Sequence, residues 1–494
     1  MRTRKIIGIA ALLLGAAPLA AATFEATVLP VPVAPGPAVA PYVRVAAGHV
    51  ALTHVRLIDG TGAAPRADMT VILNGARIAA VQPASAPIPA GTAAIDLTGR
   101  TILPGIVGMH DHMYYIGRPD LDAEGHSEPP LVVPQMTFTS PRLYLAAGVT
   151  TLRTTGSVEP YTDLNLKRQI DAGALPGPHI DVTAPYLEGP NSPFIQMHQL
   201  RDADDARRTV AFWADQGATS FKAYMNITRV ELGAAIEEAH KRGLKLTGHL
   251  CSVTYPEAAA LGIDNLEHGF FVNTQNDPGK KADLCSEGVG TPTLAAMKPG
   301  SAEASALIDT LVRRHVAITS TLPVFEQQIP AHAPLQPRVM EAMTPEAREA
   351  YLYNRNRRAM APNRTFEAAF ANDMALERQF VAAGGLLLAG PDPTGNGGVL
   401  PGYGDQREIE LLVDAGFSPV EAIRIATLNG ATYLGLAHRI GSVEAGKNAD
   451  LVVVRGDPSA HIADIEQVEI SFKDGVGYDS AKLVASVRGR YGQY

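Results

Sequence analysis

The sequence predicts an α/β protein: a (β/α)8 barrel with a small β-sandwich domain that is built from both chain ends. Two observations lead to this fold class. Apolar runs typical of strands alternate with helical patterns through the middle of the chain, and β-rich segments with turn signals occupy both ends. Strands that alternate with helices are typical of parallel sheets, and eight such strands fit a closed barrel. An open doubly wound sheet is the competing topology, but no glycine-rich phosphate turn follows the first strand.

The beginning of the chain, residues 1–22, has the pattern of a cleavable signal peptide. Arg2, Arg4 and Lys5 precede an apolar stretch that is too short to span a bilayer comfortably. A run of three alanines that ends at Ala22 then offers a small-residue cleavage site. We therefore expect cleavage near Ala22 and a periplasmic or secreted protein that is not bound to the membrane. The alternative is an uncleaved anchor.

The rest of the chain divides into four segments. Residues 23–45 are rich in proline and alanine and are expected to form an extended leader. Residues 46–103 and 441–494 contain short strands and turns, and since neither has many strands, both are expected to build one β-sandwich. Residues 104–440 form the predicted barrel, with a helical insertion over about 323–383 above the active-site face. This insertion is expected to be a lid or an oligomer contact, or equally a purely structural addition. The expected barrel strands lie near 102–109, 148–155, 179–184, 219–224, 244–249, 263–267, 315–321 and 385–390.

Composition excludes several classes of partner. The chain of 494 residues is 46% hydrophobic and 19% charged, which is typical of a globular protein. Its formal net charge is −8 and it has no long basic run, so nucleic acid and anionic membrane surfaces are not expected partners. A homo-oligomer with a small-molecule partner is expected. Cys251 and Cys285 are the two cysteines of the chain, and the sequence leaves open whether they are bridged.

Residue types that bind metals stand at the expected ends of the barrel strands. His110 and His112 flank one residue after an apolar run, and in a strand residues i and i+2 point to the same face. This spacing suits two ligands of one metal, although an isolated pair could equally be polar loop residues. Further donors end other strands, and strand ends converge on one face of a barrel. These donors are Lys222, His249, His268 and Asp392.

The motifs around these donors resemble the amidohydrolase superfamily, and the resemblance covers residues 46–494. The motifs are Gly108-Met109-His110-Asp111-His112, residues 217–222, Gly248-His249, residues 264–269, Ala389-Gly390-Pro391-Asp392, and the tail segments 422–431 and 441–451. The Lys222 and Glu267-His268-Gly269 segments are most similar to the imidazolonepropionase-related branch, with its Xaa-Pro dipeptidases, other metallodipeptidases and ochratoxin-type amide hydrolases. Pro391 departs from the usual Thr or Ser; this departure could shift the loop that carries Asp392 but leaves its assignment as a ligand intact.

This resemblance implies two divalent metal ions, with zinc expected, and a Lys222 that is carboxylated on its side-chain nitrogen and bridges them. An unmodified lysine is cationic and a poor ligand, so the alternative is a surface lysine at a strand end. Asp392 would act as general base and then as general acid. Tyr224 would hydrogen-bond the developing oxyanion; its alternative is packing at the barrel rim. The first metal would be held by His110, His112 and Asp392, and the second by His249 and His268.

The favoured function is hydrolysis, by metal-activated hydroxide, of an amide bond in a dipeptide or N-acyl amino acid, ochratoxin-type aromatic amides included. A lactonase or another ester or cyclic-amide hydrolase of the same fold is an alternative. A mononuclear deaminase is another, although it needs no bridging lysine. A non-catalytic periplasmic binding protein is disfavoured by the complete ligand set. Weaker candidates for substrate contact lie on the loops after the first and third strands. They are Tyr114, Tyr115, His126, Asn191 and His198.

Overall fold

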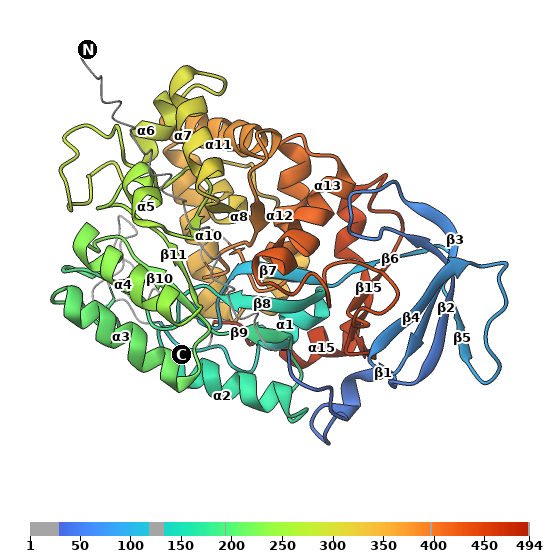
Figure 1. The fold of residues 1–494 in the computed structure, drawn as a ribbon. Coiled ribbons are helices and arrows are strands. Elements are labelled where there is room, and N and C mark those ends of the chain that lie inside the picture. The colour runs from blue at the N-terminus through green and yellow to red at the C-terminus, as the bar shows by residue number, and fades with distance from the viewer. Residues whose placement is uncertain (1–28, 118–132, 193, 396–397, 493–494) are drawn as a thin grey trace, which may run out of the picture.

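The computed structural model describes residues 29–117, 133–192, 194–395 and 398–492. The predicted signal peptide and His126 lie outside the described residues. The fold is mixed α/β, and strands β1 to β5 lie at the opposite end of the molecule from helices α3 and α4 (Figure 1). No helix within the described ranges is both long and apolar enough to cross a membrane.

One sheet of nine strands is built from both chain ends. Its order is β1-β17-β16-β15-β6-β2-β3-β4, with β5 paired to β2. The ladders are antiparallel except where β2 meets β5 and β6. Strands from both chain ends therefore pair in one hydrogen-bonded sheet. The strands are β1 (Val43–Val45), β2 (His49–Leu57), β3 (Arg66–Asn74), β4 (Arg77–Pro83), β5 (Ala93–Asp96), β6 (Arg100–Pro104), β15 (Leu451–Arg455), β16 (Val468–Lys473) and β17 (Val476–Asp479).

Two boundaries of this domain differ from the expectation. The predicted leader ends in the 3-10 helix η1 (Ala40–Tyr42) and in β1, because β1 finds a partner in β17. The predicted C-terminal β-segment ends instead in helix α15 (Ser480–Val487). Beyond that helix, the hydroxyl of Tyr491 donates a hydrogen bond to the Pro393 carbonyl at 3.2 Å, so the tail packs beside the loop that carries Asp392.

Eight parallel strands alternate with helices in the middle of the chain, each at a predicted position. They form two sheets, β7-β8-β9 and β10-β11-β12-β13-β14. A parallel bridge between Thr183 and Ser220 joins the two sheets on one side, and the Asp392 amide donates to the His110 carbonyl at 3.1 Å on the other. The described residues thus do not form one closed ladder. The strands are β7 (Ile106–Asp111), β8 (Val149–Thr154), β9 (His179–Asp181), β10 (Ser220–Ala223), β11 (Lys245–Gly248), β12 (Asn265–Glu267), β13 (Ala317–Ser320) and β14 (Leu387–Ala389).

The first predicted barrel strand, 102–109, is in fact two strands in two sheets. Gly105 separates β6 of the nine-stranded sheet from β7 of the parallel sheet. A Cβ atom at Gly105 would lie 2.0 Å from Oγ1 of Thr150, so the chain can pass this close to the neighbouring strand only without a side chain. Both halves of the run are buried and apolar, and its composition therefore conceals the break.

Helices alternate with the parallel strands, as the helical patterns in the middle of the chain predict. Helix α4 (Arg229–Lys241) begins at the capping box of Thr228 and Glu231, which satisfies two backbone amides of its first turn. The insertion at 323–383 is helical, as its composition indicates, and contains α8 (Leu322–Glu326), α9 (Pro337–Ala342), α10 (Pro345–Met360) and α11 (Arg364–Ala382). The other α-helices are α1 (Ser140–Ala146), α2 (Pro160–Asp171), α3 (Ala203–Gln216), α5 (Tyr255–Leu261), α6 (Thr291–Ala296), α7 (Ala302–Arg313), α12 (Tyr403–Asp414), α13 (Pro419–Arg424) and α14 (Gly430–Tyr433).

A buried ion cluster links the start of β9 to the C-terminal strands. His179 Nε2 lies 3.0 Å from Asp474 Oδ2, and its Nδ1 lies 3.9 Å from Asp171 Oδ1. Burial and the nearby Lys473 lower the pKa of His179, but Asp171 and Asp474 outweigh them and raise it above its usual 6.5. Asp450 also lies close to this histidine. Because Lys473 already supplies a buried positive charge beside these carboxylates, we interpret the cluster as a structural ion network.

This raised pKa predicts a pH dependence of stability. Protonated His179 should stabilise the fold fully below about pH 6.5, the unfolded value, and lose that contribution as the pH rises through its raised folded pKa. The free energy of unfolding of the wild type should therefore exceed that of His179→Gln most at low pH. Urea denaturation at several pH values between about 5 and 9 measures the difference. A difference that grows with pH would contradict this role.

Candidate active site

The C-terminal ends of five parallel strands bring the six predicted metal ligands into one region. All six side chains are buried or half-buried. Two of them lie within strands, His110 in β7 and Lys222 in β10. The others follow a strand: His112 follows β7, His249 follows β11, His268 follows β12 and Asp392 follows β14.

Two histidines and one carboxylate form the tightest group. His112 Nε2 lies 3.1 Å from Asp392 Oδ1, and His110 Nε2 lies 3.7 Å from the same oxygen. The ligand atoms of these three residues all lie within 4.8 Å of one another. Lys222 Nζ is 3.2 Å from His110 Nε2 and donates to the Thr155 carbonyl at 3.1 Å. The lysine therefore faces this group rather than solvent.

The other two histidines lie next to this group. The rings of His249 and His268 are 4.3 Å apart, and the His268 ring is 4.6 Å from that of His110. His268 Nδ1 lies 2.9 Å from Thr321 Oγ1, whereas its buried Nε2 has no hydrogen-bond partner among the described residues. An unpartnered buried imidazole nitrogen is costly unless a ligand completes it. His268 is thus oriented to offer Nε2 to a bound group.

Glu267 and Arg153 support the site, and sequence reasoning assigned neither a role. His110 Nδ1 is 2.8 Å from Glu267 Oε2, and Arg153 Nη2 donates to Glu267 Oε1 at 2.7 Å. A carboxylate that accepts the Nδ1 proton leaves Nε2 as the lone-pair nitrogen, which is how metal-binding histidines are commonly held. A charged residue within each of the short buried strands β8 and β12 was the signal that could have identified this pair.

The electrostatics hold the imidazoles and Asp392 in the protonation states that bind metals, and they bring Lys222 closer to its neutral form. Burial lowers the pKa of His112 to about 4 and that of His249 to about 3, so both imidazoles are neutral near pH 7. Burial also lowers the pKa of Lys222 to about 8, although Glu267 and Asp392 oppose the change. Burial alone would raise the pKa of Asp392, but His110 and His112 hold it below its usual range.

This donor set fits a transition metal such as zinc. Zinc binds neutral imidazole nitrogens and carboxylate oxygens, and both kinds of donor converge here. The unpartnered Nε2 of His268 also supports metal binding, as does the tautomer of His110 that its bond to Glu267 favours. The residues present therefore suit the metal that the motifs imply.

The predicted substrate and oxyanion contacts are spread more widely. The Tyr224 ring lies 4.9 Å from that of His249, and the Tyr114 ring stacks on His112 at 4.4 Å. Tyr115 packs instead in an apolar cluster against Tyr491, with the two rings 5.6 Å apart. The remaining described candidates are exposed: the backbone amide of Asn191 donates to Gln199 Oε1, and His198 Nε2 lies 3.2 Å from Asp205.

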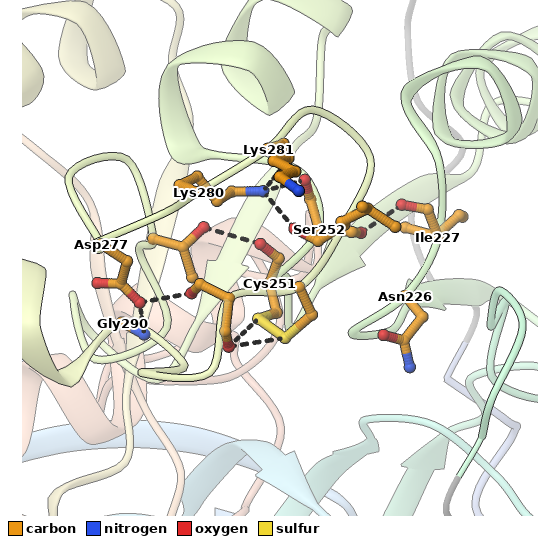
Figure 2. Close-up of a disulfide and its surroundings, with 12 residues drawn as sticks. Asn226, Ile227, Cys251, Ser252, Asp277, Lys280, Lys281 and Gly290 are labelled. Carbon is orange, nitrogen blue, oxygen red and sulfur yellow. Dashed lines mark hydrogen bonds between the residues drawn. A yellow bond between two sulfur atoms is a disulfide. The ribbon is translucent and has the colours of Figure 1, made fainter.

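A disulfide ties together the loops that follow β11 and β12. Cys251, two residues after His249, is bonded to Cys285, which settles a pairing that the sequence left open. Lys280 Nζ donates to the Ser252 carbonyl at 2.5 Å (Figure 2). The Thr274 hydroxyl donates to the Cys251 carbonyl at 2.7 Å. The loop after β12 is thereby fixed to the segment that carries His249.

Loss of this disulfide should destabilise the protein. A bridge across a sequence separation of 34 residues restricts the unfolded chain and contributes on the order of 3–4 kcal/mol to the free energy of unfolding. We expect Cys251→Ser/Cys285→Ser, or the wild type with a thiol reductant, to unfold at a lower urea concentration. The same reductant should leave the double variant unchanged. An unaltered midpoint in that variant would contradict the expectation.

Comparisons with curated proteins find short matches. Residues 402–476 match the amidohydrolase family. An adenine deaminase of Ligilactobacillus salivarius is 40% identical over 67 residues, which are 14% of this chain and 11% of that protein. A 5-methylthioadenosine/S-adenosylhomocysteine deaminase of Moorella thermoacetica is 37% identical over 90 residues, 17% of this chain and 21% of that protein. The chain thus matches only about a tenth to a fifth of these relatives' length.

Comparisons with solved structures cover most of the chain. A putative prolidase from Bifidobacterium longum superposes with a TM-score of 0.63 at 23% identity, over 90% of this chain and 100% of that one. The ochratoxinase of A. niger gives a TM-score of 0.62 at 15% identity, over 88% and 96%. At such identities these similarities show the fold. The chain therefore has the fold of amidohydrolases. Together with the family match, this confirms the resemblance that its motifs indicate.

Proposed function

We propose that the protein is a metal-dependent hydrolase of C–N bonds that cleaves an amide in a dipeptide or N-acyl amino acid. The main observation behind this proposal is that His110, His112 and Asp392 lie together beside Lys222 at the strand ends. The family match and the similarity to prolidase and ochratoxinase structures support this class of bond. We also infer that the two parallel sheets are the halves of a distorted (β/α)8 barrel, because short contacts join them on both sides.

We infer a site for two divalent metal ions, with zinc expected. The unprotonated Lys222 amine would add to CO2: its nitrogen forms a bond to carbon and releases a proton, which gives a carbamate that can bridge two cations. When bound, the metals would supply Lewis-acid activation of water and of the scissile carbonyl. The first ion would be held by His110, His112 and Asp392, and the second by His249 and His268.

The chain's own groups would position the reactants and move the proton. Asp392 Oδ1, held 3.1 Å from His112 Nε2, would accept a proton from the attacking water and pass it to the leaving nitrogen. Glu267 would keep His110 in the tautomer that exposes Nε2. Tyr224 would donate a hydrogen bond to the carbonyl oxygen as charge develops on it.

A substrate screen with metal control tests this proposal. Purified protein would be assayed against Xaa-Pro dipeptides, N-acetyl amino acids, an aromatic N-acyl phenylalanine and simple lactones. We expect hydrolysis of an amide that a chelator abolishes and added zinc restores. Lactone turnover faster than that of every amide would instead assign the protein to the ester hydrolases.

A deaminase is the second candidate because the curated matches are deaminases. Those matches cover only a short part of the chain. A mononuclear deaminase would also have no use for a lysine that lies 3.2 Å from His110 Nε2. Release of ammonia from adenine faster than hydrolysis of any amide would favour this candidate.

We also propose that the mature protein works outside the cytoplasm. The basic and apolar leader supports export. The Cys251–Cys285 disulfide supports an oxidising compartment, because such bonds are rare in the cytosol.

A further inference from the structure

Two buried tyrosine hydroxyls meet at the edge of the site. The oxygens of Tyr114 and Tyr186 lie 2.5 Å apart, and each residue is no more than 5% exposed. The pair has two hydroxyl protons, but only one is used in the bond between the two oxygens. The other proton has no acceptor among the described residues. Tyr186 follows β9 and was not among the residues predicted from the sequence.

The rings of this pair lie against the predicted metal ligands. Tyr114 stacks on His112 with ring centroids 4.4 Å apart. The Tyr186 ring lies 5.2 Å from Lys222 Nζ and 4.9 Å from the Tyr224 ring. The hydroxyl pair therefore borders the site on the side of His112, whose Nε2 is also the partner of Asp392.

Backbone and apolar side chains pack closely around the Tyr114–Tyr186 pair. Gly156 has a φ of +96°, and a Cβ atom there would lie 2.3 Å from Cζ of Tyr186, so the absence of a side chain lets the phenol end pack against the backbone. Val133, Val158 and Phe194 bury the two tyrosines in an apolar cluster. A hydroxyl proton left unpaired in such surroundings costs free energy unless a bound molecule accepts it.

Because Asp392 would protonate the leaving nitrogen, groups beside His112 should face the leaving part of the substrate. In a dipeptide or N-acyl amino acid, that part carries a free carboxylate. We propose that the Tyr114–Tyr186 pair donates its remaining proton to this carboxylate and so selects substrates that have one. The inference rests on the proposed function and specifies its substrate class. A hydroxyl bonded to a carboxylate forms a charge-assisted hydrogen bond, which is stronger than a neutral one.

Matched substrates with and without the carboxylate test this inference. The probes are N-acetyl-L-phenylalanine against N-acetylphenethylamine, and glycyl-L-proline against glycylpyrrolidine. We expect Tyr114→Phe and Tyr186→Phe each to lower kcat/KM by about tenfold to a hundredfold for the carboxylate probe that is a substrate of the wild type. The partner probe without the carboxylate should change by no more than about twofold. The double variant should lose about as much as the more severe single variant, because the two hydroxyls act as a unit.

Tyr478→Phe is the matched control, since it removes the hydroxyl of a buried tyrosine in β17 of the nine-stranded sheet. It should leave kcat/KM unchanged for both members of the probe pair. Zinc content should be equal in all variants. If Tyr114→Phe and Tyr186→Phe lower kcat/KM equally for both members of a probe pair, or for neither, the inference is wrong while the proposed function stands. A wild type that cleaves no carboxylate-bearing amide of the substrate screen would overturn the proposed substrate class, and this inference with it.

Discussion

Asp392→Asn should lower the turnover rate by on the order of a hundredfold or more while much of the metal stays bound. The asparagine amide keeps the shape of the side chain and one oxygen that can coordinate a metal. It cannot accept the proton of the attacking water or return it to the leaving nitrogen. Steady-state kinetics, together with elemental analysis of the same preparation, would separate loss of the proton carrier from loss of metal.

A second aspartate provides the control for this variant. Asp171 belongs to the ion cluster at the start of β9, at the opposite strand end from the ligands. Asp171→Asn removes a carboxylate and should leave turnover close to that of the wild type. Near-wild-type turnover by Asp392→Asn would exclude this residue as the proton carrier, whatever its metal content.

Lys222→Ala should lose the second metal and at least on the order of a hundredfold in turnover, because stabilisation by a metal ion contributes several kcal/mol. Short carboxylates such as propionate should restore part of both, since they can occupy the space of the carbamate and bridge two cations. Metal content and turnover should recover together over the same range of propionate concentration.

Lys245→Ala is the matched control for that variant. Lys245 lies at the start of β11, whereas Lys222 lies near the end of the neighbouring strand β10. The Lys245→Ala substitution therefore removes a lysine at the strand end opposite to the predicted ligands. It should retain metal and activity, and propionate should have no effect on it. Full metal loading and full activity in Lys222→Ala would show that the lysine does not bridge.

The strand pattern allowed much of the fold to be predicted, but not its sheet boundaries. Alternation of apolar runs with helices located all eight parallel strands. It could not show that the chain changes sheet at Gly105, because both sides of that residue are equally buried. It also missed β1, since a three-residue strand such as Val43–Val45 becomes a strand only through its distant partner β17.

The candidate site shows the same limit. His110, His112 and Asp392 could be anticipated because each lies at the end of an apolar run, where local pattern and strand geometry suffice. Glu267 and Tyr186 contact residues far away in the sequence, and no local pattern reveals such contacts. Residues predicted only from their place on a loop have different environments: the Tyr114 ring stacks on His112, whereas the exposed His198 pairs with Asp205.

The number of metal ions bound per chain is the most direct test of the proposed site. Elemental analysis of purified protein, after equilibration with zinc and removal of excess metal, should give close to two equivalents. Titration of a chelator should remove them and abolish hydrolysis. One equivalent that persists despite added zinc, with full activity, would contradict the account and favour a mononuclear site.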